Sequence, residues 1–340
     1  MKTYLITGGA GFIGSNFIRY ILKNHKDIFI INVDKLTYAG NPDNLTGTLI
    51  NDTNYKFYCC DICDKEKIEE IFNRYKIDYV VNFAAESHVD RSMTNTKEFI
   101  ETNITGTVNL MNIAKKAWEI RENEYIDGVR FLQISTDEVY GSCTECCSEE
   151  TPLNPHNPYS CSKAAAEFYV KCYWDAYKLP VNITRSSNNY GPYQYPEKLI
   201  PVMIHNTMEN RKLPVYGDGM QLRDWIYVED NCRAIDLVLH KGEPGEVYNI
   251  ATEKKYHNRF VVDKILTYIK GEVREDFIQH VQDRKASDLC YSISTKKIRV
   301  KLGWSPRVDF HKGLDKTIQW YLDNKEWLDK VLESRLLGED

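Results

Sequence analysis

The sequence predicts an α/β protein with a doubly wound parallel sheet and a smaller, interleaved α/β lobe toward the C-terminus. Strand-like and helix-like segments alternate through the first half of the chain, as they do where helices connect parallel strands. A glycine-rich turn joins the first such strand to the first such helix. After residue 191 the pattern becomes irregular and is interrupted by glycine and proline. We therefore expect the large sheet in residues 1–190, with the chain returning to it at about 220–240, and the smaller lobe mainly in residues 191–340.

The individual elements follow from the local hydrophobic pattern. Short apolar runs that end at a turn indicate strands, and amphipathic stretches between them indicate helices. The first run ends at Gly8 and the second at Asp34. In chain order, we expect strands at residues 4–7, 29–33, 56–58, 79–83, 131–135 and 181–184, and helices at residues 14–24, 65–75, 99–122 and 159–177.

The composition is that of an ordinary soluble enzyme. Apolar residues make up 42% and charged residues 27% of the 340 residues, and the net charge of −5 is small. Such a charge gives no support to a polyanion-binding role. The chain contains no run of about eighteen apolar residues, and the segment before Gly8 is too short for a signal peptide. We therefore expect a cytoplasmic protein with no nucleic-acid or membrane partner.

The ten cysteines indicate reduced thiols, because the cytoplasm is the expected compartment. Spacings like theirs occur at zinc sites. However, neither cysteine cluster has a histidine nearby, so we expect no metal site. A redox role stays open for the second cluster, which lies in a polar loop. The two clusters are Cys59, Cys60 and Cys63, and Cys143, Cys146 and Cys147.

The glycine-rich turn predicts a dinucleotide site in a Rossmann-like fold. Gly9, Gly11 and Gly14 match G-x-G-x-x-G, and Gly8 precedes them. Such glycines allow a tight turn, a close approach of the pyrophosphate and close packing of helix on strand, and the helix N-terminus favours phosphate. Asp34 stands twenty residues after Gly14, where a carboxylate hydrogen-bonds a ribose 2′-hydroxyl and repels a 2′-phosphate. We therefore expect NAD, with an incidental glycine turn as the alternative.

Two further residues bear on the dinucleotide site. Lys35, next to Asp34, slightly weakens the expected preference for NAD over NADP. Asp61 follows the third predicted strand and would contact the adenine.

A second motif carries acid–base chemistry. Tyr159 and Lys163 lie four residues apart, so a helix places them on one face, where the ammonium would lower the pKa of the phenol. Such a pair can take a proton from an alcohol. Thr136, Asp137 and Glu138 follow an apolar strand and should emerge at the carboxyl edge of the sheet, where open α/β folds bind ligands. Their two carboxyl groups would supply a second acid–base pair, with solvated surface charges as the alternative.

These motifs resemble those of one enzyme family. The segments that carry the likeness are residues 34–41, 84–92, 136–138, 187–193, 196–201 and 223–225, and it runs from Thr7 to Tyr321. The chain is similar to the extended short-chain dehydrogenases/reductases. Among them it resembles the nucleotide-sugar 4,6-dehydratases, most closely those that act on dTDP-glucose. Related 4-epimerases share the glycine motif and the Tyr–Lys pair but lack the Asp–Glu doublet.

The resemblance implies a role for each catalytic residue. Tyr159, assisted by Lys163, would deprotonate the sugar 4-hydroxyl while NAD takes the hydride from C4, and Thr136 would hydrogen-bond that oxygen. Glu138 would remove the acidified proton from C5, and a protonated Asp137 would release the C6 hydroxyl as water. The hydride then returns to C6, which gives a 4-keto-6-deoxy sugar with no net use of cofactor. The enzyme would be a hydro-lyase.

The resemblance also implies the binding residues, while His88 is expected to be structural. For NAD they are Gly8, Gly11, Phe12, Ile13, Gly14, Asp34, Lys35, Leu36, Thr37, Asp61, Ile62, Phe83, Ala84, Ala85, Thr102, Tyr159, Lys163 and Asn189. For the nucleotide sugar they are Ser87, Thr136, Asn188, Lys198, Leu199, Pro214, Tyr216, Arg223, Asn258 and Arg284.

The sequence departs from the family pattern near Arg284, where Ser287 and Cys290 replace the usual histidine and arginine. The preference for thymine or uracil therefore stays open. Two other functions also stay open: a nucleotide-sugar 4-epimerase and a catalytically silent NAD-binding regulatory protein. Related enzymes form homodimers through helices that here would be residues 99–122 and 159–177, so a homodimer is expected.

Overall fold

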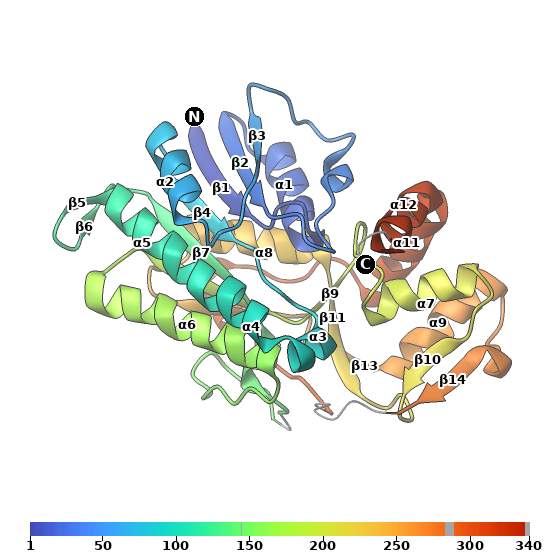
Figure 1. The fold of residues 1–340 in the computed structure, drawn as a ribbon. Coiled ribbons are helices and arrows are strands. Elements are labelled where there is room, and N and C mark those ends of the chain that lie inside the picture. The colour runs from blue at the N-terminus through green and yellow to red at the C-terminus, as the bar shows by residue number, and fades with distance from the viewer. Residues whose placement is uncertain (144, 283–288, 337–340) are drawn as a thin grey trace.

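The computed structural model describes residues 1–143, 145–282 and 289–336. A large sheet with helices on both faces lies beside a smaller lobe (Figure 1). All neighbouring strands of the large sheet run parallel, so the predicted doubly wound sheet is confirmed. From edge to edge its strands are β12 (Val247–Ile250), β8 (Val181–Ser186), β7 (Arg130–Thr136), β4 (Tyr79–Asn82), β1 (Lys2–Thr7), β2 (Ile28–Asp34) and β3 (Tyr55–Cys59).

Alternate residues of the strands face two hydrophobic layers, one on each side of the sheet. In β1, Tyr4 and Ile6 belong to one layer and Leu5 to the other. Because both faces are covered, the strands read as nearly continuous apolar runs. The order β2–β1–β4 reverses the direction of winding at β1, and ligands of open α/β sheets bind at such a point, outside the carboxyl ends of the strands.

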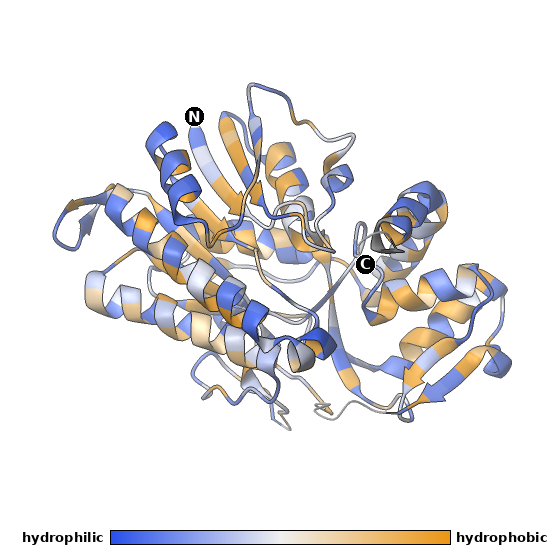
Figure 2. Cartoon of the chain, viewed as in Figure 1, coloured by the Kyte–Doolittle hydropathy of each residue, from blue (hydrophilic) through white to orange (hydrophobic). Residues whose placement is uncertain are grey.

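The helices of the large sheet are amphipathic, and Figure 2 shows hydrophobic and hydrophilic residues on each of them. Those of the first layer pack against one another, as do those of the second. The first layer holds α1 (Phe12–Asn24) and α8 (Val228–Lys241), and the second holds α2 (Lys65–Arg74), α5 (Thr107–Trp118) and α6 (Pro158–Tyr177).

The smaller lobe has its own core and is interleaved with the sheet. Its strand β11 (Leu222–Tyr227) pairs with β9 (Asn188–Tyr190) and β13 (Lys255–His257). Between β11 and β13 the chain passes back through α8 and β12 of the large sheet. The lobe also contains β10 (Leu213–Tyr216), β14 (Ile278–Val281), α7 (Leu199–Met208), α9 (Asn258–Lys270), α11 (Phe310–Asp323) and α12 (Lys325–Leu336).

The helix expected at residues 99–122 ends earlier than predicted. It is preceded by α4 (Thr96–Phe99) and the π-helical segment η2 (Ile100–Gly106), and α5 stops at Trp118. A hairpin follows, with Asn123 in the left-handed region and the Ile126 amide donating to the Trp118 carbonyl. The remaining short elements are η1 (Pro42–Leu45), α3 (Val89–Thr94), β5 (Glu119–Arg121), β6 (Glu124–Tyr125), η3 (Asp137–Tyr140), η4 (Glu275–Phe277) and α10 (Lys296–Leu302).

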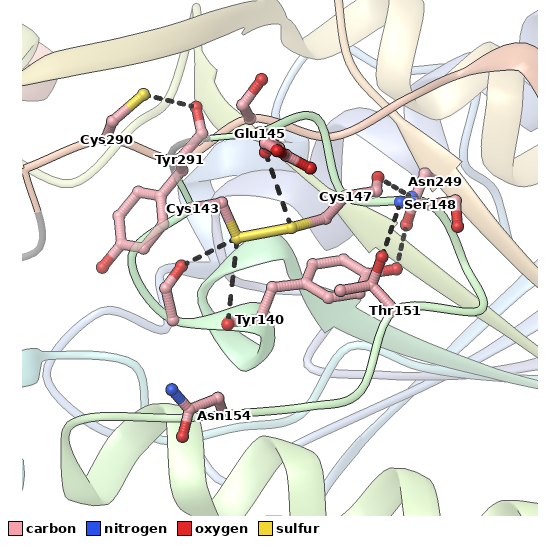
Figure 3. Close-up of a disulfide and its surroundings, with 12 residues drawn as sticks. Tyr140, Cys143, Glu145, Cys147, Ser148, Thr151, Asn154, Asn249, Cys290 and Tyr291 are labelled. Atoms are coloured by element: carbon pink, nitrogen blue, oxygen red, sulfur yellow. Dashed lines mark hydrogen bonds between the residues drawn. A yellow bond between two sulfur atoms is a disulfide. The ribbon is translucent and has the colours of Figure 1, made fainter.

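The expectation that all cysteines are reduced is wrong for one pair, because Cys143 and Cys147 form a disulfide (Figure 3). The backbone around them explains the pairing. The Cys143 amide donates to the Cys290 carbonyl at 3.1 Å, and the Cys147 amide donates to the Ser292 carbonyl at 2.8 Å. These bonds fold the loop against the segment that carries Tyr291. None of the helices in the described ranges is both long and apolar enough to span a membrane.

Candidate active site

A cavity of about 850 Å³ lies at the carboxyl ends of the sheet strands. Its walls come from the glycine turn, from the ends of β2, β4 and β7, from the start of α6 and from the smaller lobe. Seven of the buried polar atoms without a hydrogen-bond partner among the described residues belong to its lining. They are on Ser135, Asp137, Asn188, Asn189, Gln194, Trp225 and Asn258. Buried polar atoms are normally paired, so these atoms indicate a polar ligand.

The glycine turn leaves a cradle at one end of the cavity. Gly8 has a φ of +68°, and a Cβ at Gly14 would lie 2.3 Å from the Gly8 carbonyl oxygen, so neither position tolerates a side chain. Gly11 is the N-cap of α1 and provides no side-chain cap. The first amides of α1 therefore remain available for a phosphate, whose charge the helix dipole also favours.

Asp34 ends β2 beside this cradle and is 9% exposed. Its carboxylate accepts hydrogen bonds from the Ala10 amide at 2.9 Å and the Leu36 amide at 2.8 Å. Burial raises the pKa of Asp34, and these two bonds oppose the rise. Next to it, the Lys35 ammonium lies 2.8 Å from the Asp61 carboxylate. The two acidic groups expected to hold the adenosine thus stand at one end of the cavity.

The acidic doublet follows β7 in the short helix η3. The Thr136 hydroxyl caps this helix by accepting from the Glu138 amide at 3.2 Å. The Asp137 side chain is only 3% exposed, whereas Glu138 is half-buried. Burial first, and then the charges of Glu138 and Asp224, raise the pKa of Asp137 well above its ordinary value. This shift favours the neutral form of one carboxyl group of the doublet, while the other group is more exposed to water.

The predicted pair of Tyr159 and Lys163 lies in the first turns of α6. Asn157 caps this helix in a reciprocal capping box with Ser160, which fixes the first turn and with it Tyr159. The buried Lys163 ammonium donates to the Ile134 carbonyl at 2.6 Å, and burial lowers its pKa to about 8. Thr136 hydrogen-bonds the Tyr159 hydroxyl.

The pKa of Tyr159 differs from the sequence prediction. Burial, followed by the charge of Glu138, raises this pKa above its ordinary value, although the bond to Thr136 opposes the rise. The expectation that the Lys163 ammonium lowers the pKa of the phenol is therefore wrong for the protein without ligands. The cause is that burial withdraws the phenolate from water.

The opposite wall carries the cations. The Arg223 guanidinium lies 4.6 Å from the centre of the Tyr291 ring, and the Lys198 ammonium donates to the Ser87 carbonyl at 2.9 Å. Next to Arg223, the buried Asp224 accepts from the Thr252 hydroxyl at 2.7 Å, which ties β11 to the end of the sheet. Two cations in the lining of one cavity suit the diphosphate of a nucleotide.

Nearly all the predicted site residues meet in this cavity. Leu36 does not line it, since its backbone turns away with a φ of +56° while its amide binds Asp34. Arg284 lies outside the described residues. His88 caps α3 by accepting from the Arg91 amide, as a structural histidine would. The predicted residues that line the cavity are Gly8, Gly11, Phe12, Ile13, Gly14, Asp34, Lys35, Thr37, Asp61, Ile62, Phe83, Ala84, Ala85, Ser87, Thr102, Thr136, Asp137, Glu138, Tyr159, Lys163, Asn188, Asn189, Lys198, Leu199, Pro214, Tyr216, Arg223 and Asn258.

Several other lining residues were not predicted, and three of them contact predicted residues. The Asn157 amide donates to Glu138 at 3.5 Å, Glu197 lies 3.9 Å from His88, and Tyr291 stacks on Arg223. For Asn157 a signal existed, because Asn before Pro158 is typical of an N-cap. For Tyr291 none existed, since its partner is far away in the sequence.

Comparison with known proteins shows the family to which this chain is similar. The family described as GDP-mannose 4,6 dehydratase matches residues 5–317. A dTDP-glucose 4,6-dehydratase from Neisseria meningitidis serogroup B is 47% identical over 344 residues, which cover 98% of this chain and 96% of that protein. A crystal structure of dTDP-glucose 4,6-dehydratase from Bacillus anthracis in complex with NAD is 44% identical, with a TM-score of 0.87 over 97% of this chain and 100% of that chain. A dTDP-glucose 4,6-dehydratase from Streptomyces venezuelae with NAD bound is 40% identical, with a TM-score of 0.89 over 97% and 99%.

Proposed function

The chain belongs to the family described as GDP-mannose 4,6 dehydratase, and we propose that it is a dTDP-glucose 4,6-dehydratase that uses NAD. It converts the hexose to a 4-keto-6-deoxy sugar and releases water. The observation that carries this proposal is Asp137, a buried carboxyl group with a raised pKa beside the half-buried Glu138. Oxidation alone does not need such a pair, whereas elimination of water needs an acid and a base together.

The residues of the glycine turn fit NAD. The amides that begin α1 would hold the pyrophosphate, and Asp34 would accept from the adenosine ribose. When bound, NAD supplies the acceptor and later the donor of the hydride and, in its oxidised form, a positive charge. The buried Asp34 disfavours the 2′-phosphate of NADP, since two negative groups would meet there.

The first proton transfer is the work of Tyr159. Its phenolate oxygen takes the proton of the sugar 4-hydroxyl, and the Thr136 hydroxyl, which hydrogen-bonds Tyr159, orients the same oxygen. Lys163, whose ammonium donates to the Ile134 carbonyl, would provide a positive charge on the same face of α6 as Tyr159. These three groups come from the end of β7 and the first turns of α6, two rigid elements that contact each other.

The second proton transfers are those of the acidic doublet. Glu138 removes the proton from C5, which the ketone at C4 has made acidic, and later returns a proton there. Asp137, kept neutral by burial, donates its proton to the C6 hydroxyl, which leaves as water. The amide of Asn157, 3.5 Å from the Glu138 carboxylate, orients the base.

Product analysis tests this function. Purified protein with NAD is incubated in parallel with dTDP-glucose and UDP-glucose, and the products are analysed by mass spectrometry. We expect a dTDP sugar that is lighter by one water, formed faster than its UDP counterpart. With deuterium at C4 of the substrate, the label should appear at C6. A product of unchanged mass with inverted C4 would identify a 4-epimerase, and unchanged substrate would identify a silent NAD-binding protein.

A homodimer is part of the proposal. The helices α5 and α6 lie side by side on the outer face of the large sheet (Figure 1). On α6, Phe168 is 62% and Tyr169 is 47% exposed, which supports an apolar contact with a second copy. Sedimentation should give the mass of a dimer, and Phe168→Glu should give a monomer. A monomeric native protein would contradict this part.

The domain boundaries and the location are also proposed. We assign the NAD site to residues 1–190, with the chain returning at about 220–240, and the nucleotide-sugar site mainly to residues 191–340. The position of β12 in the large sheet supports an interleaved arrangement that extends this return to residue 250.

We propose the cytoplasm as the location, because NAD and nucleotide sugars are available there, and cell fractionation would test it.

A further inference from the structure

Two histidines and an aspartate that the proposed reaction does not use meet on the far side of the molecule. Asp236 and His240 lie one turn apart near the end of α8, and His25 immediately follows α1. The His25 Nε2 atom lies 2.8 Å from Asp236 Oδ1, and the His240 Nδ1 atom lies 3.1 Å from the same oxygen. Within the described residues these side chains form a group whose ligand atoms all lie within 4.8 Å of one another.

From this geometry we propose that His25, Asp236 and His240 form a binding site for a divalent transition-metal cation such as Zn²⁺. Two imidazoles and one carboxylate, with further positions left for water, suit Zn²⁺ and its neighbours in the first transition row. Ligands about 2.0–2.1 Å from a tetrahedral zinc stand roughly 3.3 Å apart. The observed contacts at the shared oxygen are a few tenths of an ångström shorter, so the side chains must open slightly around a cation. The His240 Nδ1 atom also lies 2.8 Å from the Asp236 carbonyl oxygen, and it must leave this contact to bind a cation.

The site has access to solvent. The side chains of His25, Asp236 and His240 are 28%, 16% and 24% exposed. A cation can therefore enter without unfolding, and water can complete its coordination. The three groups are also held in place, because α1 and α8 pack against one another and the two imidazole rings stack with centroids 5.0 Å apart.

The surroundings also provide an outer shell. The His240 Nε2 atom is hydrogen-bonded to the Tyr4 hydroxyl at 2.9 Å. A metal on Nδ1 requires the ring proton to be on Nε2, which then donates to the Tyr4 oxygen. Ligating histidines usually have such a partner for their second nitrogen, and it fixes the tautomer and the ring orientation.

The proposed metal site is distinct from the active site. Tyr4 and Tyr79, whose rings border His240, lie near the starts of β1 and β4, whereas the catalytic residues follow the carboxyl end of β7. A bound cation would join the end of α1 to the last turns of α8. We therefore expect it to raise the melting temperature and to leave the catalytic rate unchanged.

Titration with Co²⁺ tests the proposal. The full-length protein is stripped of metal with a chelator and titrated without added thiol, while visible absorption and thermal unfolding are recorded. We expect one Co²⁺ to bind per chain and the melting temperature to rise. The absorption spectrum should lack a cobalt–thiolate charge-transfer band. His25→Asn and Asp236→Asn should each weaken binding at least tenfold and abolish that rise. Tyr4→Phe, which removes only the hydroxyl that is hydrogen-bonded to His240 Nε2, should weaken binding roughly 10- to 100-fold.

The control is His280→Asn. This histidine is exposed on β14 in the other lobe, and its substitution should change nothing. Circular dichroism verifies that each variant is folded, and His25→Asn is the mildest change because its ring is the most exposed of the three. Absence of binding, equal binding by the native protein and His25→Asn, or binding only through cysteine thiolates would overturn the proposal.

Discussion

Replacing Asp137 by Asn tests the proposed mechanism and the electrostatics of the site together. Asn has nearly the same shape as Asp but cannot donate the proton that releases the C6 hydroxyl. Removal of a general acid typically lowers the rate about 10²- to 10⁴-fold, which corresponds to about 3–5 kcal/mol in the barrier. In the proposed mechanism, oxidation at C4 depends on Tyr159 and Lys163, so it should continue, and enzyme-bound NADH should accumulate.

The same substitution should stabilise the protein at neutral pH. In the folded state the pKa of Asp137 lies above its ordinary value, whereas in the unfolded chain it is near about 3.9. Between these two values the folded state keeps a proton that the unfolded state releases, so stability falls as the pH rises through this window. Each pH unit costs about 1.4 kcal/mol, and Asn at this position avoids the cost. At low pH both proteins hold a neutral side chain, and their stabilities should converge.

Stopped-flow absorbance of NADH, steady-state product formation and urea unfolding at several pH values together check this prediction. Glu138→Gln is the matched comparison, since it removes the neighbouring carboxylate from a half-buried position and should also leave C4 oxidation intact. Asp218→Asn, at an exposed turn, is the neutral control. Full dehydratase turnover by Asp137→Asn would refute the assignment of the acid. A variant less stable than the native protein at pH 7 would refute the reasoning about burial.

Three other changes address the binding walls and the disulfide. Arg223→Lys keeps the charge but loses the planar stack on Tyr291. The KM for dTDP-glucose should therefore rise roughly 2- to 30-fold, which corresponds to about 0.5–2 kcal/mol of cation–π attraction. An unchanged KM in steady-state assays would contradict this role. Asp34→Ala removes the carboxylate that accepts hydrogen bonds from two backbone amides and, in the proposal, from the ribose hydroxyl. The Kd for NAD, measured by fluorescence, should therefore rise roughly 10- to 100-fold. Equal affinity would mean that Asp34 is only structural. Cys143→Ser should lower the free energy of unfolding by about 2 kcal/mol and make it insensitive to reductant. If the oxidised and reduced native proteins had the same free energy of unfolding, the disulfide would be contradicted.

The parts of the site that the sequence predicts are those that depend on neighbours along the chain. The glycine turn, the Thr136 triplet and the Tyr159–Lys163 pair each lie within a few residues, and a strand end or a helix face then fixes their relative positions. The parts that were missed depend on contacts between distant segments. Asp236 lies 211 residues after His25, so the pairing of α1 with α8 had to be known before their cluster could be found.

The Cys143–Cys147 disulfide was missed for a related reason. The cysteine count and the expected compartment indicated reduced thiols. The pairing instead depends on the hydrogen bonds between the 143–147 loop and the segment around residues 290–292, which the local sequence does not reveal. The raised pKa of Tyr159 belongs to the same class, because the depth of a side chain in a cavity depends on the walls that distant segments build.

The acidic doublet shows why adjacency in sequence does not imply equivalence in chemistry. Asp137 and Glu138 begin a short helix and both line the cavity, but Asp137 is buried whereas Glu138 is only half-buried. The Thr136 cap fixes the backbone here by binding the Glu138 amide. Burial then favours the neutral form of the first carboxyl group, and its closeness to the second adds to that effect. In the proposed mechanism, one turn of helix thus supplies both an acid and a base from two similar residues, and the stability lost by burying Asp137 is a direct consequence of that division.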